Sequence, residues 1–305
     1  MTASVLYDAP GPKARRRSMM TSVVGTIVIV AILGWLIATL AGERTTVAGA
    51  TLPGLFDASR WDIFNDLVVW RSIGEGALAT LSMAGTAAVL ALVIGVLFSF
   101  GRTAGSRWIR VPVAILLEFF RGMPVLLMML FALLVFSTGT YWAGVSALAV
   151  YNGAIIGEAL RAGIQSLPSG QREAGLSLGL TSVATRFLIE FPQAFRTMLP
   201  IIVAQLVVLL KDTSLAYIVG YSELLRTNQN LTQFFGNRYA FSFFFIVLAL
   251  YLTMNLLLSW VARIVSHRTS SRGGALIASD DPEHGAGHDA DTAVASRENR
   301  EASGP

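Results

Sequence analysis

The sequence predicts an all-α, polytopic membrane protein with six transmembrane helices. Hydrophobic residues make up 54% of the chain and charged residues only 14%, and the mean hydropathy is +0.61. Soluble domains average about 25% charged residues. The apolar residues also gather in blocks as long as the roughly 20 residues that a helix needs to cross a bilayer. Six spans are expected, at residues 19–41, 73–100, 112–137, 141–163, 197–220 and 240–263.

The first 72 residues are expected to form a basic N-terminus (1–18), one helix (19–41) and an extracytoplasmic loop (42–72). The apolar block 19–41 is longer than the roughly 7–15 residues of a signal-peptide core, and no clean A-x-A site follows it. We therefore predict an uncleaved helix. In the loop, Trp61 and Trp70 are expected to anchor at the headgroups, where tryptophan is enriched.

The later connections follow from turn residues and charge. The tight turn at 138–140 predicts that the third and fourth spans form an antiparallel hairpin. Residues 164–196 form a long inner loop and 221–239 a polar outer loop. Residues 266–305 contain few apolar residues and are expected to be a disordered cytoplasmic tail, because they cannot bury enough apolar surface to fold.

Basic residues set the expected orientation. With both termini in the cytoplasm, the inner ends of the six spans carry fourteen Lys and Arg residues, and the outer loops carry five. Inner loops are enriched in Lys and Arg, so this topology is favoured over its inverse, in which the ratio would be reversed.

Several classes of chemistry are absent from the sequence. There is no cysteine, and the three histidines (His267, His284 and His288) all follow the last span. No metal site and no catalytic constellation is expected, so the chain is not predicted to be an enzyme. Neither Lys13 nor Lys211 lies in a G-x-x-x-x-G-K-[ST] loop, so any ATP must be bound by a partner.

The inner loop carries the most specific pattern, EAGLSLGLTSVATRFLIEFP at 173–192. Helical turns are expected over 171–178 and 182–190, with Thr181 or Ser182 as the N-cap of the second. Gly179 supplies the bend because glycine tolerates positive φ. Glu173 is expected in a first turn, where the helix dipole favours a negative charge. The small residues would let another protein approach closely.

This pattern resembles the EAA loop of ABC-importer permeases, and the matching positions are Glu173, Ala174, Gly179, Ile189 and Pro192. Gly175 replaces the third small residue of the motif, and Phe191 replaces its leucine. In that family the loop docks on a separate ATPase, so the resemblance implies that these six positions (173, 174, 175, 179, 189 and 192) form an ATPase-coupling loop.

Neighbouring stretches resemble the polar amino-acid group of the same family. They are the Arg121-Gly122-Met123-Pro124 tetrapeptide, the segment 151–174 and the segment 207–225. The opening VLYDAPGPK and the stretch EFFRGMPVL resemble the glutamate transport permeases of actinobacteria. The resemblance implies that residues 73–265 are a five-helix type I importer core and that the first span is an extra N-terminal helix.

The resemblance also implies the partners and the activity. Two ABC ATPase subunits, a second permease that is identical or homologous, an extracytoplasmic amino-acid-binding protein and membrane lipid are expected. No cofactor and no nucleic acid is expected. The implied function is ATP-driven import of an amino acid, glutamate first, by alternating access; aspartate and glutamine stay open. The alternative is an ion-coupled secondary transporter or channel.

Charged residues within the spans are candidates for the substrate pathway or a gate, because charges in hydrocarbon are costly. These candidates are Arg121, Glu158, Lys211 and Asp212. Arg121 can pair with Glu118, and Glu158 with Arg161, so self-neutralised helix ends remain an alternative. Lys211 or Arg121 would meet a substrate carboxylate and Asp212 an ammonium group; an inter-helix salt bridge is the competing hypothesis.

Gly153 and Gly157 form a G-x-x-x-G pattern, which permits close helix packing in lipid. The sequence leaves open whether that packing occurs within the subunit or between subunits.

Overall fold

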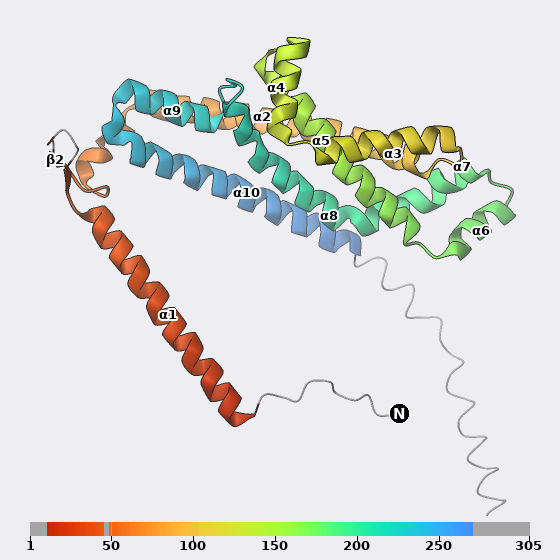
Figure 1. Cartoon of the computed structure of the whole chain (residues 1–305), viewed down its shortest axis with the longest axis horizontal. Helices are drawn as coiled ribbons and strands as arrows, with labels where there is room; N and C mark the ends of the chain where they lie inside the picture. Colours follow the sequence, from red (N-terminus) through yellow and green to blue (C-terminus); the bar gives the residue numbers. More distant parts are fainter. Residues whose placement is uncertain (1–10, 46–48, 50, 271–305) are drawn as a thin grey trace, which may run out of the picture. The chain divides into compact units, whose positions relative to one another are not determined.

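The computed structural model describes residues 11–45, 49 and 51–270, and helices dominate this part of the chain (Figure 1). The helices are α1 (Pro12–Ala41), α2 (Leu67–Thr103), α3 (Arg107–Gly122), α4 (Val125–Phe136), α5 (Gly139–Gln165), α6 (Ser169–Ser177), α7 (Ser182–Thr185), α8 (Phe191–Asp212), α9 (Leu224–Phe235) and α10 (Ala240–Ser270). Two short strands, β1 (Arg44–Thr45) and β2 (Thr51–Leu52), pair antiparallel.

The prediction of an all-α membrane protein with six spans is confirmed. Five helical segments among the described residues are long and apolar enough to cross a membrane, and α3 with α4 makes a sixth when this bent pair counts as one span. The first helix begins at Pro12, earlier than the predicted residue 19, and α2 begins at Leu67, inside the predicted outer loop. Residues 1–10 lie outside the described residues.

The third predicted span, 112–137, is wrong as a single helix. α3 and α4 are bent by 104° at the two residues between them, and Figure 1 shows α4 leaving α3 steeply. Met123 is extended there, with φ −86° and ψ 135°. The residue before a proline is disfavoured in the α region, and Pro124 therefore breaks the helix.

Two further boundaries differ from the prediction. The predicted outer loop 221–239 contains the helix α9. The polar residues of this segment had indicated a loop without a helix. At the other end, α10 continues to Ser270, so residues 266–270 of the predicted tail are helical. The rest of that tail lies outside the described residues.

The described residues of 1–77 and 224–249 form one compact unit. An aromatic cluster joins the start of α10 to the segment before α2: Trp61 packs edge-to-face on Phe245 and Phe64 on Phe243. Arg60 is only 4% exposed and donates hydrogen bonds to the carbonyls of Pro53 and Arg238. Trp61 thus packs against other side chains of the protein, a contact that was not part of the predicted headgroup anchoring.

Residues 78–223, together with the described chain from 250 onward, form the second unit. Helix α5 is at its centre and packs on α4 and α8. The most apolar window of α5 is 67% buried, against 22% for the Ser182–Tyr217 span. The core side chains are mostly aliphatic and include Met83, Met129, Leu148, Leu160, Ile202 and Leu209.

The G-x-x-x-G pattern of α5 packs within the subunit. A Cβ at Gly153 would lie 2.7 Å from Ile94 Cγ2, and one at Gly157 would lie 2.8 Å from Phe98 Cβ and 3.0 Å from the Gly95 carbonyl. Both contacts are with α2. The sequence left open whether these glycines pack within the subunit or between subunits, and the structure shows close packing of α2 against α5 within the subunit.

Candidate functional site

The inner loop folds as two short helices around a glycine turn. Gly179 has φ +80°, and Leu180 N donates to the Gly175 carbonyl at 3.2 Å, which closes the end of α6. Thr181 Oγ1 accepts a hydrogen bond from Ala184 N at 3.2 Å and so caps α7. The expected helix, glycine bend and N-cap are confirmed.

The outer surface of this loop is exposed and mixed in character. Glu173 and Ala174 are exposed on α6, and Leu178 and Val183 beside the glycine turn are 80% and 63% exposed. Because α6 begins at Ser169, Glu173 lies in its second turn; the expected first-turn position was wrong. This side of the loop therefore presents one acidic and two aliphatic side chains on the surface of the subunit.

Gly175 and Ile189 contact each other within the loop. A Cβ at Gly175 would lie 2.6 Å from Thr185 Cγ2 and 2.9 Å from Ile189 Cδ1. Gly175 is buried by these side chains, so its small size serves contact between α6 and the segment after α7. The expectation that this glycine thins the loop for another protein was wrong.

The helix from Ser182 continues through the predicted loop-to-span boundary at residue 196 into α8 and on to Tyr217, so no break in the helix marks that boundary. Near its start this helix contains a π turn, Arg186–Glu190, closed by Phe191 N donating to the Arg186 carbonyl. Pro192 follows at the start of α8. Proline clashes with the carbonyl four residues earlier, and the wider π turn relieves that clash.

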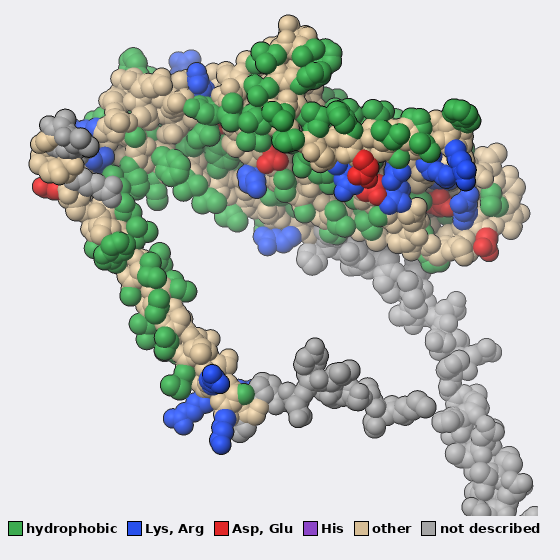
Figure 2. Space-filling view, in the orientation of Figure 1, with side chains coloured by type: hydrophobic (Ala, Val, Ile, Leu, Met, Phe, Trp, Pro, Cys, Tyr) green, Lys and Arg blue, Asp and Glu red, His purple; other side chains and the backbone are tan. Residues whose placement is uncertain are grey.

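Charged residues near the C-terminal ends of α2, α3 and α5 form ion pairs, and Figure 2 shows acidic and basic side chains gathered on this part of the surface. Arg121 lies 3.3 Å from Glu118. Glu158 accepts from Arg161 Nε at 2.9 Å and lies 3.7 Å from Arg102 Nε of α2. The two expected pairs are present, and Arg102 is an added partner. Glu158 thereby links α2 to α5.

Lys211 and Asp212 lie at the end of the regular α-helical part of this span. They are the last two residues of α8, and a 3-10 turn, Thr213–Tyr217, follows them. Lys211 is exposed and Asp212 half-buried. In the described part of the chain neither forms an ion pair within 4.0 Å, so an inter-helix salt bridge within this subunit is not observed.

Two buried polar groups of the same unit were missed in the sequence. Glu223 is fully buried and accepts a hydrogen bond from Tyr251 Oη of α10 at 2.6 Å. Asn152, also fully buried, accepts from Gln205 Nε2 at 2.8 Å and joins α5 to α8. Such groups need partners in a core. Glu223 lies in a stretch noted for its resemblance, but nothing in the residue pattern indicated its burial.

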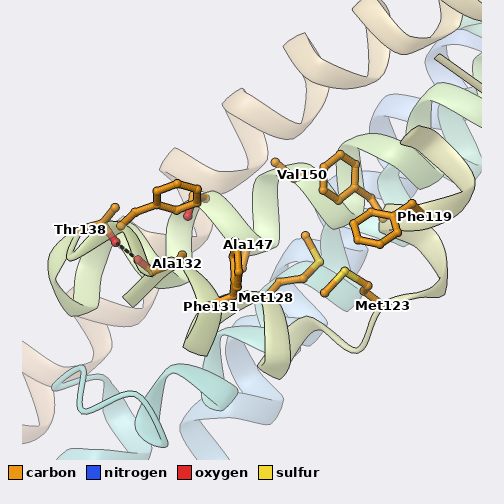
Figure 3. Close-up of a pocket in the computed structure, with 11 residues that line it drawn as sticks. Phe119, Met123, Met128, Phe131, Ala132, Thr138, Ala147 and Val150 are labelled. Atoms are coloured by element: carbon orange, nitrogen blue, oxygen red, sulfur yellow. Dashed lines mark hydrogen bonds between the residues drawn. The ribbon is translucent and has the colours of Figure 1, made fainter. Parts of the chain in front are cut away.

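A cavity of about 510 Å³ opens between α3, α4 and α5. Phe119, Met123, Met128 and Phe131 point into it (Figure 3). Its lining carries no charged group and only two polar side chains, Thr138 and Ser146, so it offers no opposite charge to the ammonium and carboxylate groups of an amino acid. The cavity is not a candidate substrate site.

Comparison with known proteins identifies the family. Residues 91–271 match the family described as binding-protein-dependent transport system inner membrane component. The chain belongs to this family. Its members in the comparison include the glutamate transport system permease protein of Corynebacterium glutamicum, 40% identical over 57% of this chain and 67% of that protein. The glutamine transport system permease protein of Escherichia coli K12 is 33% identical over 67% of this chain and 97% of that protein.

Solved structures of the family have the same fold. A chain from the crystal structure of an amino acid ABC transporter with histidines superposes with a TM-score of 0.61, at 26% identity, over 68% of this chain and 98% of that one. A chain of an inward-facing methionine ABC transporter gives 0.57 over 67% of this chain, and at 17% identity it bears on the fold alone. The resemblance noted in the sequence is thus confirmed.

Proposed function

We propose that this chain is the permease subunit of an ATP-driven amino-acid importer and that glutamate is its main substrate. The observation that carries the proposal is the 40% identity to a glutamate transport system permease protein. The 33% identity to a glutamine permease supports an amino-acid substrate without separating the two.

The proposed mechanism is alternating access. An external binding protein delivers the amino acid to the outer side, and two ABC ATPase subunits dock on the loops at 173–192 of this chain and of a second permease. Closure of the ATPases moves these loops. The helix that starts at Ser182 is continuous with the span, so it provides a direct route for this movement into the bundle.

We base the proposed docking of the ATPase on the exposed surface of this loop. Docking of a cytoplasmic ATPase requires that this loop and both termini lie in the cytoplasm. Leu178, Val183 and Glu173 are exposed, so their side chains are accessible to a docking partner. The distribution of basic residues supports the same orientation.

The proposed substrate predicts the behaviour of a deletion strain. We expect uptake of labelled glutamate to fall when the gene is deleted and to return when it is restored, because the chain forms part of the proposed path of the substrate across the membrane. Competition by unlabelled glutamate, aspartate and glutamine would rank the substrates. Unchanged glutamate uptake in the deletion strain would contradict glutamate as the main substrate.

Lys211, Asp212 and Arg121 are proposed to contact the substrate, with Asp212 facing its ammonium group and a basic residue its carboxylate. The exposure of Lys211 within the single subunit leaves its ammonium group available to a ligand. Glu158 is proposed to act at the gate through its pairs with Arg161 and Arg102, because the pair with Arg102 joins α2 to α5.

Substitution of these residues gives a second prediction. Lys211→Ala and Asp212→Ala should each reduce glutamate uptake about 10–100-fold, since a hydrogen bond to a charged group contributes about 1.5–3 kcal/mol. Ile218→Ala, at an exposed side chain seven residues beyond Lys211, is the control. Uptake and the amount of chain in the membrane are measured together. Full activity of both variants at normal membrane levels would exclude substrate contact by these residues.

A further inference from the structure

The joint between the coupling loop (residues 173–192) and α8 is a π turn that carries an ion pair. Arg186 Nε lies 3.7 Å from Glu190 Oε2, and the two side chains are only 13% and 9% exposed. π turns are rare and occur frequently at functional sites. A buried ion pair is weak evidence of stabilisation, because desolvation of both charges opposes their attraction. The pair therefore calls for a role beyond stability.

Hydrogen bonding at this turn is incomplete. Arg186 Nε and the hydroxyl of the preceding Thr185 are buried, and neither has a hydrogen-bond partner within the described residues. Buried polar groups without partners are few in native proteins, and each one calls for an explanation. Two of them in consecutive residues indicate a turn whose geometry is imposed by its surroundings rather than by its own hydrogen bonds.

Those surroundings connect three parts of the molecule. On one side, Gly175 of α6 packs on Thr185 and Ile189, which flank the ion pair. On another, Phe187 stacks on Phe100 of α2, with ring centroids 3.8 Å apart and planes 9° apart. Glu190 directly precedes Phe191, the first residue of α8. The π turn thus fixes how the loop is oriented on two spans at once.

We propose that Arg186 and Glu190 are positioning residues that transmit the movement of the coupling loop to α8. This inference rests on the proposed function and deepens it by naming the joint. A π turn holds one more residue than an α turn. Conversion of this π turn into regular α-helix would therefore rotate the loop before it by about 100° relative to α8 after it. With the ion pair intact, the loop and α8 move together as a rigid body. Without it, the turn relaxes and the loop moves alone.

The consequence is uncoupling: ATP hydrolysis continues while transport falls. Removing a single partner would strand a buried charge and could unfold the loop. The informative variant is therefore the double substitution Arg186→Leu with Glu190→Leu, which replaces the pair by apolar side chains. The exchange of charges, Arg186→Glu with Glu190→Arg, retains the pair and should restore coupling.

The experiment uses the complete importer, with its ATPases and binding protein, reconstituted in liposomes. ATP hydrolysis and transport of labelled glutamate are measured on the same samples. For the double leucine variant we expect hydrolysis to stay within about twofold of the native value and transport per ATP to fall at least about fivefold, the lower end of typical coupling between sites. The exchanged pair and the control Arg110→Ala, an exposed arginine outside the loop, should keep the native ratio.

Three outcomes overturn the inference. The double leucine variant could keep the native ratio, the exchanged pair could fail to restore it, or hydrolysis and transport could fall together as folded protein is lost. Glu173→Lys in the same assay separates this inference from the proposed function. If Glu173→Lys impairs the importer and the double leucine variant does not, only the inference fails; if both variants behave as native, the loop does not couple and both proposals fail.

Discussion

Glu173→Lys is expected to reduce amino-acid uptake at least about tenfold while the chain still reaches the membrane. The side chain is exposed in the second turn of α6 and is not needed for the fold of the loop. A lysine there would place the wrong charge at the proposed ATPase contact, where like charges facing one another cost several kcal/mol. Because α6 itself is unchanged, the effect should appear in ATPase binding.

The measurement combines uptake, membrane abundance and copurification of the ATPase with the permease. Glu43→Lys, a charge reversal at an exposed glutamate outside the loop, is the matched control and should behave as native. Glu173→Gln should have a smaller effect, because it removes the charge without reversing it. A Glu173→Lys chain that binds the ATPase and transports normally would show that this side of α6 is not the docking surface.

Local patterns were sufficient to predict the bend and the N-cap of the loop at 173–192. Gly179 and Thr181 act through their own backbone and near neighbours, so the bend and the N-cap could be predicted without knowledge of the rest of the fold. Membrane spans are predictable for a related reason, since length and hydropathy are properties of a contiguous segment.

Other features depended on tertiary contacts and were beyond the sequence. The position of Gly175 against Thr185 and Ile189 requires that α6 folds back on the π turn. Arg102, next to Glu158, comes from a helix more than fifty residues away in the chain. The buried pair of Asn152 and Gln205 is equally distant in sequence. No spacing rule relates such residues, because the two helices meet only in the folded bundle.

The 104° bend is an intermediate case. The sequence contains a residue that favours a bend, Pro124, but the high hydropathy of the whole stretch favoured a single helix. Pro124 follows Met123 in the middle of a long apolar stretch, and hydropathy favoured one helix across it. A proline inside a span does not always end the helix: Pro112 and Pro200 lie within α3 and α8. The difference is that Met123 is extended, which the residue types alone do not determine.

Gly157→Leu is expected to prevent normal packing of α2 against α5. Even the first carbon of a side chain would lie 2.8 Å from Phe98 Cβ and 3.0 Å from the Gly95 carbonyl, closer than such contacts allow. The backbone of α2 cannot give way without loss of the neighbouring contact of Gly153 with Ile94. Overpacking of this kind costs about 1–3 kcal/mol or more.

The measurement is the thermal unfolding midpoint of the purified chain in detergent, together with its yield from the membrane. At about 2–4 °C per kcal/mol for a chain of this size, Tm should fall by several degrees. Gly85→Leu, in α2 with open space around the glycine, is the matched control and should leave Tm unchanged. Gly157→Ala should lie between the two, since it adds only the Cβ. An unchanged midpoint for Gly157→Leu would mean that α2 and α5 do not pack at this glycine, and that the G-x-x-x-G pattern serves another surface.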